Sequence, residues 1–116
     1  MKVFDVIVVG ELNIDIIMNG INRFPEIGKE ILAESLDVTL GSSSAIFASN
    51  LSSLGSRVAF LGKIGKDEFA LTVLNSLQSK GVDTSNIIQS DTLKTGATLV
   101  LNFDQDRAMV TYPGAM

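Results

Sequence analysis

The sequence predicts an α/β fold in which helices flank a parallel β-sheet and a smaller antiparallel β layer covers one end. Two segments, 45–54 and 67–80, carry apolar residues at helical spacing, and a continuous apolar run lies between them at 58–61. With a first strand before them, they give a β–α–β–α order, which favours a parallel sheet. Three other segments alternate between apolar and polar residues, as half-buried strands do. These segments are 12–18, 31–40 and 97–112.

The first strand is predicted over Val3 to Val9, a run rich in β-branched residues that ends at Gly10. Its apolar character predicts a central parallel strand that is followed by a loop. Asp5 interrupts the run and no A-x-A-like cleavage site follows, so we interpret it as a strand and not as a signal peptide. No run approaches the roughly 18 apolar residues of a membrane span. We therefore expect a cytoplasmic protein with no membrane partner.

Both predicted helices have start and stop signals. Ser42, Ser43 and Ser44 are candidate N-caps of the first helix, and Gly55 ends it. Asp67 caps the second helix, which Gly81 stops. The apolar stripes predict which residues face the core. They are Phe47, Ala48, Leu51 and Leu54 in the first helix and Ala70, Val73, Leu74 and Leu77 in the second, and we expect Phe60 and Phe69 in the core as well.

The remaining segments predict strands and turns. Residues 30–40 favour an amphipathic strand, although their Glu, Leu and Ala content also permits a helix. Residues 82–88 predict a loop that leads into a short strand. Residues 96–112 predict a hairpin whose tip, 104–106, is a solvated turn.

The composition excludes several classes of function. Nine basic and thirteen acidic residues give a net charge of −4, which argues against a nucleic-acid partner. The chain has no cysteine, so disulfides and thiolate chemistry are excluded, and no histidine, so imidazole catalysis and histidine-bound zinc are excluded. A length of 116 residues suffices for one domain with a sizeable core.

Polar residues follow the first strand where an α/β sheet binds its ligand. Asn13 and Asp15 are two residues apart, so in an extended segment both side chains leave the same face. Downstream, the Gly/Ser loop at 41–44 opens a helix and points backbone N–H groups at the cleft. The two observations predict a binding site for a hydroxylated ligand. The alternative is that Asn13 and Asp15 only cap a turn.

These features, in this order, resemble the N-terminal portion of the ribokinase-like (PfkB) carbohydrate kinases. The resemblance covers essentially the whole chain through seven short motifs, of which the order is more specific than any single one. The motifs are Gly10–Asp15, Phe24-Pro25 with Gly28, Gly41, Leu54-Gly55 with Gly62, Gly65 and Asp67, Gly81–Thr84, Thr95-Gly96, and Gly114-Ala115.

The resemblance implies a sugar-binding role. Asn13 and Asp15 would bind sugar hydroxyls, and Gly41, Ser42 and Ser43 would line the same pocket. Residues 1–11 and 41–95 would belong to the α/β core, and residues 12–40 and 96–112 to a lid that closes over the sugar. Members of the family often form homodimers through this lid, so we expect a homodimer here.

The resemblance also implies that the catalytic base and the nucleotide site lie outside these 116 residues. In the family, a Gly-Ala-Gly-Asp segment in the C-terminal half supplies the catalytic base and the anion hole, and the site for ATP and Mg²⁺ lies there too. These 116 residues contain no such segment. We therefore expect no catalytic, nucleotide-binding or metal-binding residue in this chain, and no phosphoryl transfer by the chain alone.

Two positions depart from the family pattern. Ser42 replaces the second glycine of the sugar loop, and Ile46 replaces the asparagine four residues further on. The Ser42 hydroxyl can still bond a sugar, but the Ile46 side chain can donate nothing. We therefore expect a substrate pocket different from that of a ribose-type member.

Two other functions fit parts of the pattern. A Rossmann dinucleotide-binding domain shares the βαβ order, but the first turn, Gly10 to Asn13, lacks G-x-G-x-x-G. A non-catalytic sugar-binding or assembly module would use the open edges of the lid strands to pair with another chain. Titration with NAD tests the first alternative, and sedimentation of the chain tests the second.

Overall fold

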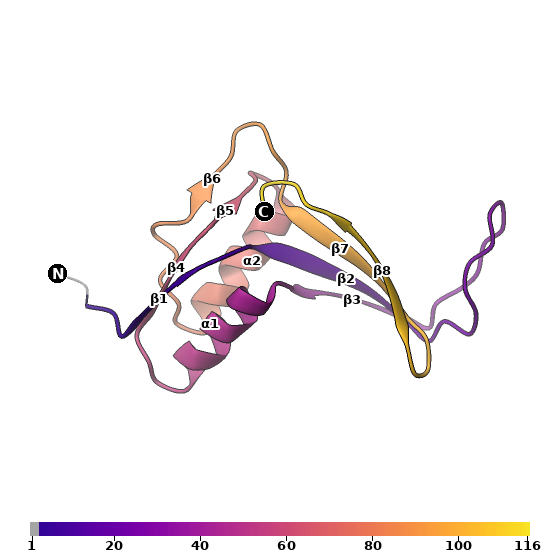
Figure 1. Ribbon diagram of the computed structural model, residues 1–116, viewed down its shortest axis with the longest axis horizontal. Helices are drawn as coiled ribbons and strands as arrows, with labels where there is room; N and C mark the ends of the chain where they lie inside the picture. The colour runs from indigo at the N-terminus through magenta and orange to yellow at the C-terminus, as the bar shows by residue number, and fades with distance from the viewer. Residues whose placement is uncertain (1–2) are drawn as a thin grey trace.

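The computed structural model describes residues 3–116, and it contains an α/β portion from which a long curved sheet extends to one side (Figure 1). The core segment predicted from residue 1 is described from Val3 onward, since residues 1 and 2 lie outside the described part. The strands are, in order, β1 (Val6–Val9), β2 (Asn13–Asn19), β3 (Ser35–Leu40), β4 (Val58–Leu61), β5 (Lys63–Ile64), β6 (Ile88–Gln89), β7 (Gly96–Asn102) and β8 (Arg107–Tyr112). The two helices are α1 (Ser43–Ser53) and α2 (Glu68–Ser79).

The α/β portion contains short parallel strands beside the two helices. β1 pairs with β4 and β5 pairs with β6, both in parallel, and a bridge between Ala59 and Asp83 extends the first pair. β4 is buried from Val58 to Phe60, as its continuous apolar run predicts. The core is formed by side chains from the strands and the inner faces of both helices. Its largest fully buried members are Phe60, Leu12, Ile14, Ile64, Leu77, Val58 and Val73.

The second helix matches its prediction closely. Asp67 is the N-cap residue, and its carboxylate accepts a hydrogen bond from the backbone N–H of Ala70 at 2.9 Å. Ala70, Val73 and Leu77 are buried, which confirms the predicted stripe. Lys80 is the C-cap, and Gly81 follows with a φ of +86°. The helix therefore has both its start and its stop where the sequence signals place them.

The first helix differs from its prediction in the face that it buries. Its buried residues are Ala45, Ala48 and Ser49, whereas Phe47 is 54% exposed and Leu54 is 84% exposed. The expectation that Phe47 lies in the core is therefore wrong. The physical reason is that α1 lies close to β4 and β1, and only its small residues allow the helix axis to approach strands so closely.

The first strand is shorter and more exposed than predicted. β1 begins at Val6, and among the described residues its strand partner is β4 alone. Val8 is buried, but Ile7 and Val9 point away from the helices and are exposed. The predicted parallel pairing is confirmed, but within residues 3–116 β1 is an edge strand and not the predicted central strand.

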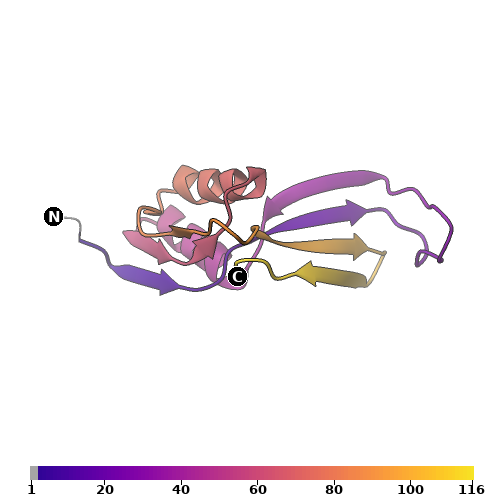
Figure 2. The same cartoon turned by 90° about the horizontal axis from the view of Figure 1, so that it is seen from above.

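The curved extension is one four-stranded sheet, with the order β3-β2-β7-β8, which we call the lid sheet. The outer pairs, β2–β3 and β7–β8, are antiparallel, but the central pair β2–β7 is parallel. The predicted purely antiparallel layer is therefore a mixed sheet. Its centre is parallel because both central strands leave the α/β portion in the same direction (Figure 2). The strand predicted over residues 30–40 begins only at Ser35.

The two faces of the lid sheet differ in polarity. Register places Asp15 beside Thr39 and Thr98, and Thr98 beside Thr111, so one cross-strand row is entirely polar. The next row, on the opposite face, is entirely apolar. It contains Val38, Ile16, Leu99 and Val110. The face that carries Asp15 is therefore mixed, because its next row contains Ile17, Val100 and Met109, whereas the other face of the lid sheet is apolar.

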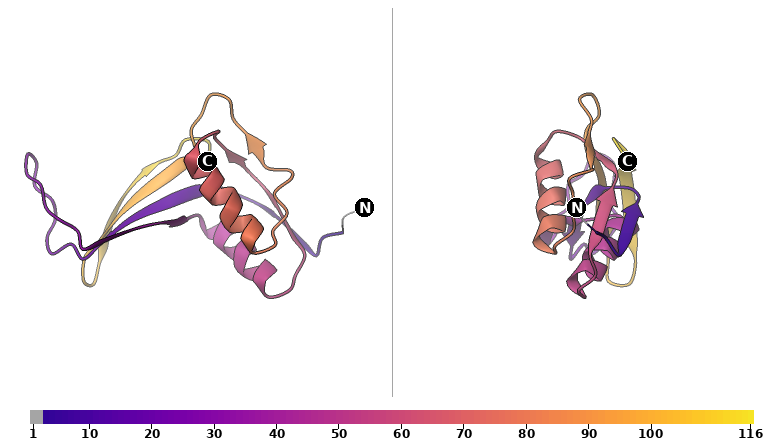
Figure 3. Two further views of the ribbon diagram at one scale, coloured as in Figure 1. Left: turned by 180° about the vertical axis from the view of Figure 1, so that it is seen from behind. Right: turned by 90° about the vertical axis from the view of Figure 1, so that its left-hand side faces the viewer.

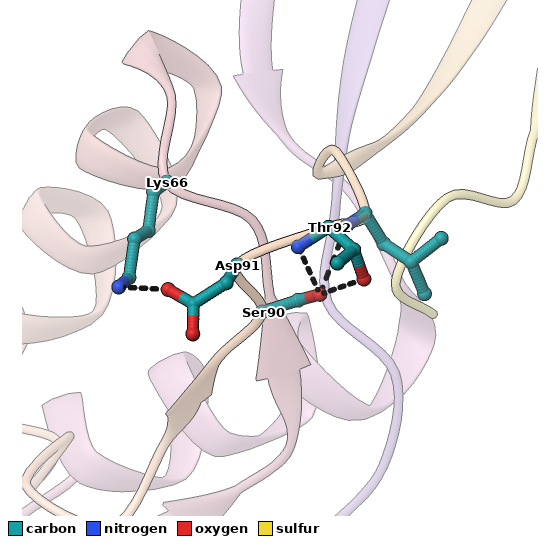
Figure 4. A network of polar contacts seen from close by, with 5 residues as sticks. Lys66, Ser90, Asp91 and Thr92 are labelled. Atoms are coloured by element: carbon teal, nitrogen blue, oxygen red, sulfur yellow. Dashed lines mark hydrogen bonds and ion pairs between the residues drawn. The ribbon is translucent and has the colours of Figure 1, made fainter.

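A network of polar contacts holds the segment that leads from β6 into the lid sheet (Figure 4). The buried Ser90 hydroxyl accepts hydrogen bonds from the backbone N–H groups of Thr92 at 3.2 Å and Leu93 at 2.9 Å. Lys66 forms an ion pair with Asp91 on the same segment. These contacts fix the backbone just before Thr95 and Gly96, where the chain enters β7.

Candidate sugar-binding site

Asn13, Asp15 and Gly41 converge where the lid sheet meets the α/β portion. A Cβ atom placed on Gly41 would lie 2.4 Å from Oδ1 of Asn13 and 2.6 Å from Oδ1 of Asp15. Real Cβ atoms do not approach other atoms so closely, so this position accepts only glycine while both side chains keep their places. The N–H of Gly41 donates to the carbonyl of Asn13 at 2.9 Å, which holds the two segments together. The structure thus brings together three residues that the sequence singled out.

Asn13 is 4% exposed and has one polar atom without a partner among the described residues. Its Nδ2 donates to the hydroxyl of Thr98 at 3.1 Å, whereas Oδ1 accepts no hydrogen bond within residues 3–116. A buried acceptor without a donor costs about 1–3 kcal/mol. The orphaned oxygen lies beside the Asp15 carboxylate, so two acceptors meet where a ligand that donates hydrogen bonds would satisfy both.

Asp15 lies in the polar row of the lid sheet, between Thr39 and Thr98. Partial burial raises the pKa of the Asp15 carboxyl above its ordinary value, and the positive charge of Arg107 offsets part of this rise. Arg107 begins β8, on the same face of the sheet. A carboxylate in such a place gains more from a hydroxyl donor than an exposed one does, because less water competes.

The two serines of the loop differ in what they contact. Ser42 has a φ of +69°, and it is the one non-glycine residue of the described chain with a positive φ. Its hydroxyl donates to the carbonyl of Glu11 at 2.7 Å and lies 3.0 Å from the hydroxyl of Ser44. Ser42 is the N-cap residue of α1, as one of the three predicted candidates, but its side chain makes no capping hydrogen bond. Ser43, the first residue of α1, is exposed.

A pocket of about 500 Å³ opens beside Asp15 and continues between the two helices. Thr39 and Leu40 of β3 form its wall on the lid side, and Ile46 lies on the α1 side. Polar side chains of the helices complete it. They are Ser49 and Asn50 of α1, Ser76 and Ser79 of α2, and Lys80. The candidate site is therefore polar at Asp15 and has an apolar surface at Ile46.

A second polar cluster, which the sequence did not predict, joins α2 to the lid sheet. Asp67 accepts hydrogen bonds from the backbone N–H of Thr95 at 2.9 Å and from its hydroxyl at 2.7 Å. The Thr95 hydroxyl in turn accepts from the N–H of Gly65 at 3.0 Å. Asp67 and Thr95 are 28 residues apart, so a motif search sees two unrelated positions. The helix cap thus also holds the start of β7.

Other features of the described residues bear on ligands. No group of three or more acidic side chains within residues 3–116 is placed to hold a metal ion. Neither helix described in the structure is long and apolar enough to span a membrane. The hairpin tip at 104–106 is exposed, in agreement with a solvated turn.

Comparison with known proteins identifies the family of the chain. The family model described as "pfkB family carbohydrate kinase" matches residues 3–116. The chain belongs to the pfkB family of carbohydrate kinases. Figure 3 shows the architecture of this family member, in which the lid sheet extends away from the α/β portion.

Individual pfkB relatives agree in sequence and in fold. Ribokinase from Bacillus subtilis is 26% identical over 111 residues, which are 96% of this chain and 38% of the relative. A 5-dehydro-2-deoxygluconokinase from Clostridium tetani is 37% identical over 106 residues, which are 90% of this chain and 28% of the relative. The chain thus spans less than two fifths of these pfkB kinases.

A solved pfkB structure shows the same fold. Arabidopsis thaliana ribokinase, complexed with ribose and ATP, superimposes with a TM-score of 0.88 at 25% identity. The match covers 98% of this chain and 37% of the ribokinase. The fold is therefore part of the ribokinase-like α/β fold.

Proposed function

We propose that this chain forms the sugar-binding part of an ATP-dependent carbohydrate kinase, which phosphorylates a hydroxyl of a sugar or related polyol. The observation that supports this most strongly is the meeting of two acceptor oxygens, from Asn13 and Asp15, beside Gly41. Sugar hydroxyls are donors, and each carboxylate or carboxamide can pair with two of them. The unpartnered Oδ1 of Asn13 would gain the partner that it lacks.

The proposal assigns a role to each part of the site. Asn13 and Asp15 bind the hydroxyls, and Gly41 leaves room for the sugar beside them. Ser42 and Ser43 directly follow Gly41, and the proposal has them contact the same sugar, although neither lines the pocket beside Asp15. The lid sheet covers the bound sugar and excludes water, which limits transfer of phosphate to water.

The phosphate donor is proposed to bind outside these residues. The relatives are named as kinases of ribose and of 5-dehydro-2-deoxygluconate, and one solved relative contains ATP. Phosphoryl transfer requires a nucleotide site, Mg²⁺ and a base that takes the proton of the sugar hydroxyl. Within residues 3–116, no cluster of three or more acidic side chains is placed to hold a metal ion. We assign these elements to the rest of the kinase, and the use of ATP favours a cytoplasmic location.

A sugar panel tests the proposal on the 116-residue chain. We expect D-ribose, D-fructose or 5-dehydro-2-deoxygluconate to bind in an equilibrium titration, while ATP with Mg²⁺ transfers no phosphate to any of them. A chain that binds none of the sugars would contradict the sugar-binding role. Phosphate transfer by the chain alone would contradict the assignment of the base and nucleotide site to another part.

The apolar face of the lid sheet supports a homodimer through the lid. Val38, Leu99 and Val110 of one cross-strand row are exposed, and Val110 is 70% exposed. Leu36 and Tyr112 on the same face are also exposed. Contiguous exposed apolar surface of this kind marks a protein interface. We infer that the lid sheets of two chains pack through these faces.

Replacing Val110 by lysine should convert this dimer to a monomer, because a charge at the centre of an apolar interface loses its water without gaining a partner. Sedimentation velocity measures the change. Leu71→Lys is the matched control, since Leu71 is a similarly exposed residue on α2 and is not part of the lid sheet. A wild-type chain that sediments as a monomer, or a Val110→Lys dimer, would contradict the inference.

A further inference from the structure

Ile46 is an apolar side chain in a place where the fold does not require one. It lies in the first turns of α1, one residue after the buried Ala45, and its side chain is 43% exposed. The helix buries Ala45, Ala48 and Ser49, so Ile46 contributes little to the core. A β-branched residue also has a lower helix propensity than Leu, Glu or Lys. Neither packing within residues 3–116 nor helix formation explains this isoleucine.

Ile46 lines the pocket that opens beside Asp15. Ile46 and Asp15 line the same pocket of about 500 Å³, together with Thr39 and Leu40. Asp15 can accept hydrogen bonds, whereas the methyl and methylene groups of Ile46 can neither donate nor accept one. A bound sugar that reaches from Asp15 to Ile46 therefore meets a hydrogen-bonding surface at one carbon and an apolar surface at another.

The two surfaces favour different groups on the sugar. A hydroxyl that is buried against Ile46 loses its bonds to water and gains none from the side chain. A CH₂ group in the same place loses nothing and removes apolar area from water. An apolar surface discriminates between such pairs by about tenfold to a hundredfold.

We propose that the substrate is a deoxy sugar whose CH₂ carbon packs against Ile46 while its neighbouring hydroxyls bind Asp15 and Asn13. This inference rests on the proposed sugar-binding role and specifies the class of sugar. Ile46 acts in it as a specificity-determining residue. It predicts a preference for the deoxy member of any pair of sugars that differ by one hydroxyl at the contacting carbon.

Paired sugars test the proposal. The probes are D-ribose with 2-deoxy-D-ribose, and D-glucose with its 2-deoxy, 3-deoxy and 6-deoxy forms, each titrated into the chain by NMR. At least one deoxy sugar is expected to bind tenfold or more tightly than its parent. The Ile46→Asn variant offers an amide to the hydroxyl that the parent sugar has and the deoxy form lacks. In this variant the parent sugar is expected to bind at least as tightly as the deoxy form. Leu71→Asn makes the same chemical change on an exposed face of α2 and is expected to keep the wild-type ratio.

The outcomes separate this inference from the proposed function. Equal binding of parent and deoxy sugars by the wild type, with saturable shifts at Gly41, would overturn the deoxy preference and leave the sugar-binding role supported. The deoxy preference would also be overturned, and the sugar-binding role supported, if Ile46→Asn kept the wild-type ratio of deoxy-sugar to parent-sugar affinity. Absence of binding by every sugar would overturn both.

Discussion

Replacing Asp15 by alanine is expected to weaken sugar binding about 100-fold. A hydrogen bond to a charged group contributes about 1.5–3 kcal/mol, and a carboxylate in the polar row of the lid sheet can accept two. Within the intact kinase the same change should raise KM for the sugar or abolish turnover. Titration of the wild type and of Asp15→Ala with one sugar of the panel measures the change.

A second aspartate provides the control for Asp15. Asp37 lies in β3 on the same face of the lid sheet, opposite Ile17, and its carboxylate accepts a hydrogen bond from Asn19. Asp37→Ala also removes a carboxylate, but on β3, two residues from the Thr39 that pairs with Asp15 and further from Gly41. We expect its sugar affinity to stay within about twofold of the wild type. Equal affinities for the wild type and Asp15→Ala would show that Asp15 does not bind the sugar.

Replacing Asp67 by alanine should lower the free energy of unfolding by about 2 kcal/mol. Loss of an N-cap costs about 0.5–2 kcal/mol, and Asp67 also accepts two hydrogen bonds from Thr95. These bonds hold α2 against the start of β7, so we also expect faster amide hydrogen exchange at Thr95 and Gly96. Urea unfolding and hydrogen exchange measure the two effects.

The contribution of the Asp67 carboxylate to the free energy of unfolding should depend on pH. Burial acts to raise the pKa of Asp67, but the hydrogen bonds from Thr95 and Ala70 outweigh it, so the pKa is lower in the folded chain. A carboxyl with a depressed folded pKa stabilises the fold above its unfolded value of about 3.9, and this stabilisation disappears as pH falls through the folded pKa. The difference in the free energy of unfolding between the wild type and Asp67→Ala should therefore have its full size at pH 7 and decrease below about pH 4.

Asp91 is the control for these measurements. Its carboxylate pairs with Lys66 on the surface, and this pair lowers the pKa of Asp91 too. Exposed ion pairs contribute little to stability, so Asp91→Ala should unfold at nearly the wild-type urea concentration. If Asp67→Ala and Asp91→Ala were equally stable, Asp67 would not join the helix to the lid sheet as the structure indicates.

Local signals predicted the elements whose ends are fixed by local chemistry. The second helix extends between the predicted cap at Asp67 and the predicted stop at Gly81 because both act through neighbouring backbone groups. The hairpin of β7 and β8 also follows from alternation and a polar tip. Asn13 and Asp15 were singled out together because residues two apart share a face of any strand.

Long-range packing accounts for what the sequence did not reveal. Phe47 has the spacing of a core residue, but an apolar pattern records a preference for burial and not the distance between a helix and its sheet. The parallel pairing of β2 with β7 depends on how two distant segments leave the α/β portion. The bonds between Asp67 and Thr95, and the position of Arg107 on the face of Asp15, likewise arise only from tertiary register.

The convergence of Asn13, Asp15 and Gly41 on one sugar is tested most directly by NMR titration of the ¹⁵N-labelled chain. The side-chain amide of Asn13 and the backbone amide of Gly41 report on the two sides of the site. We expect both signals to shift along one saturable curve with the same dissociation constant, and to remain unshifted in Asp15→Ala at the same sugar concentration. Shifts confined to other residues, such as those around Asn102 and Arg107 at the far end of the lid sheet, would contradict the account.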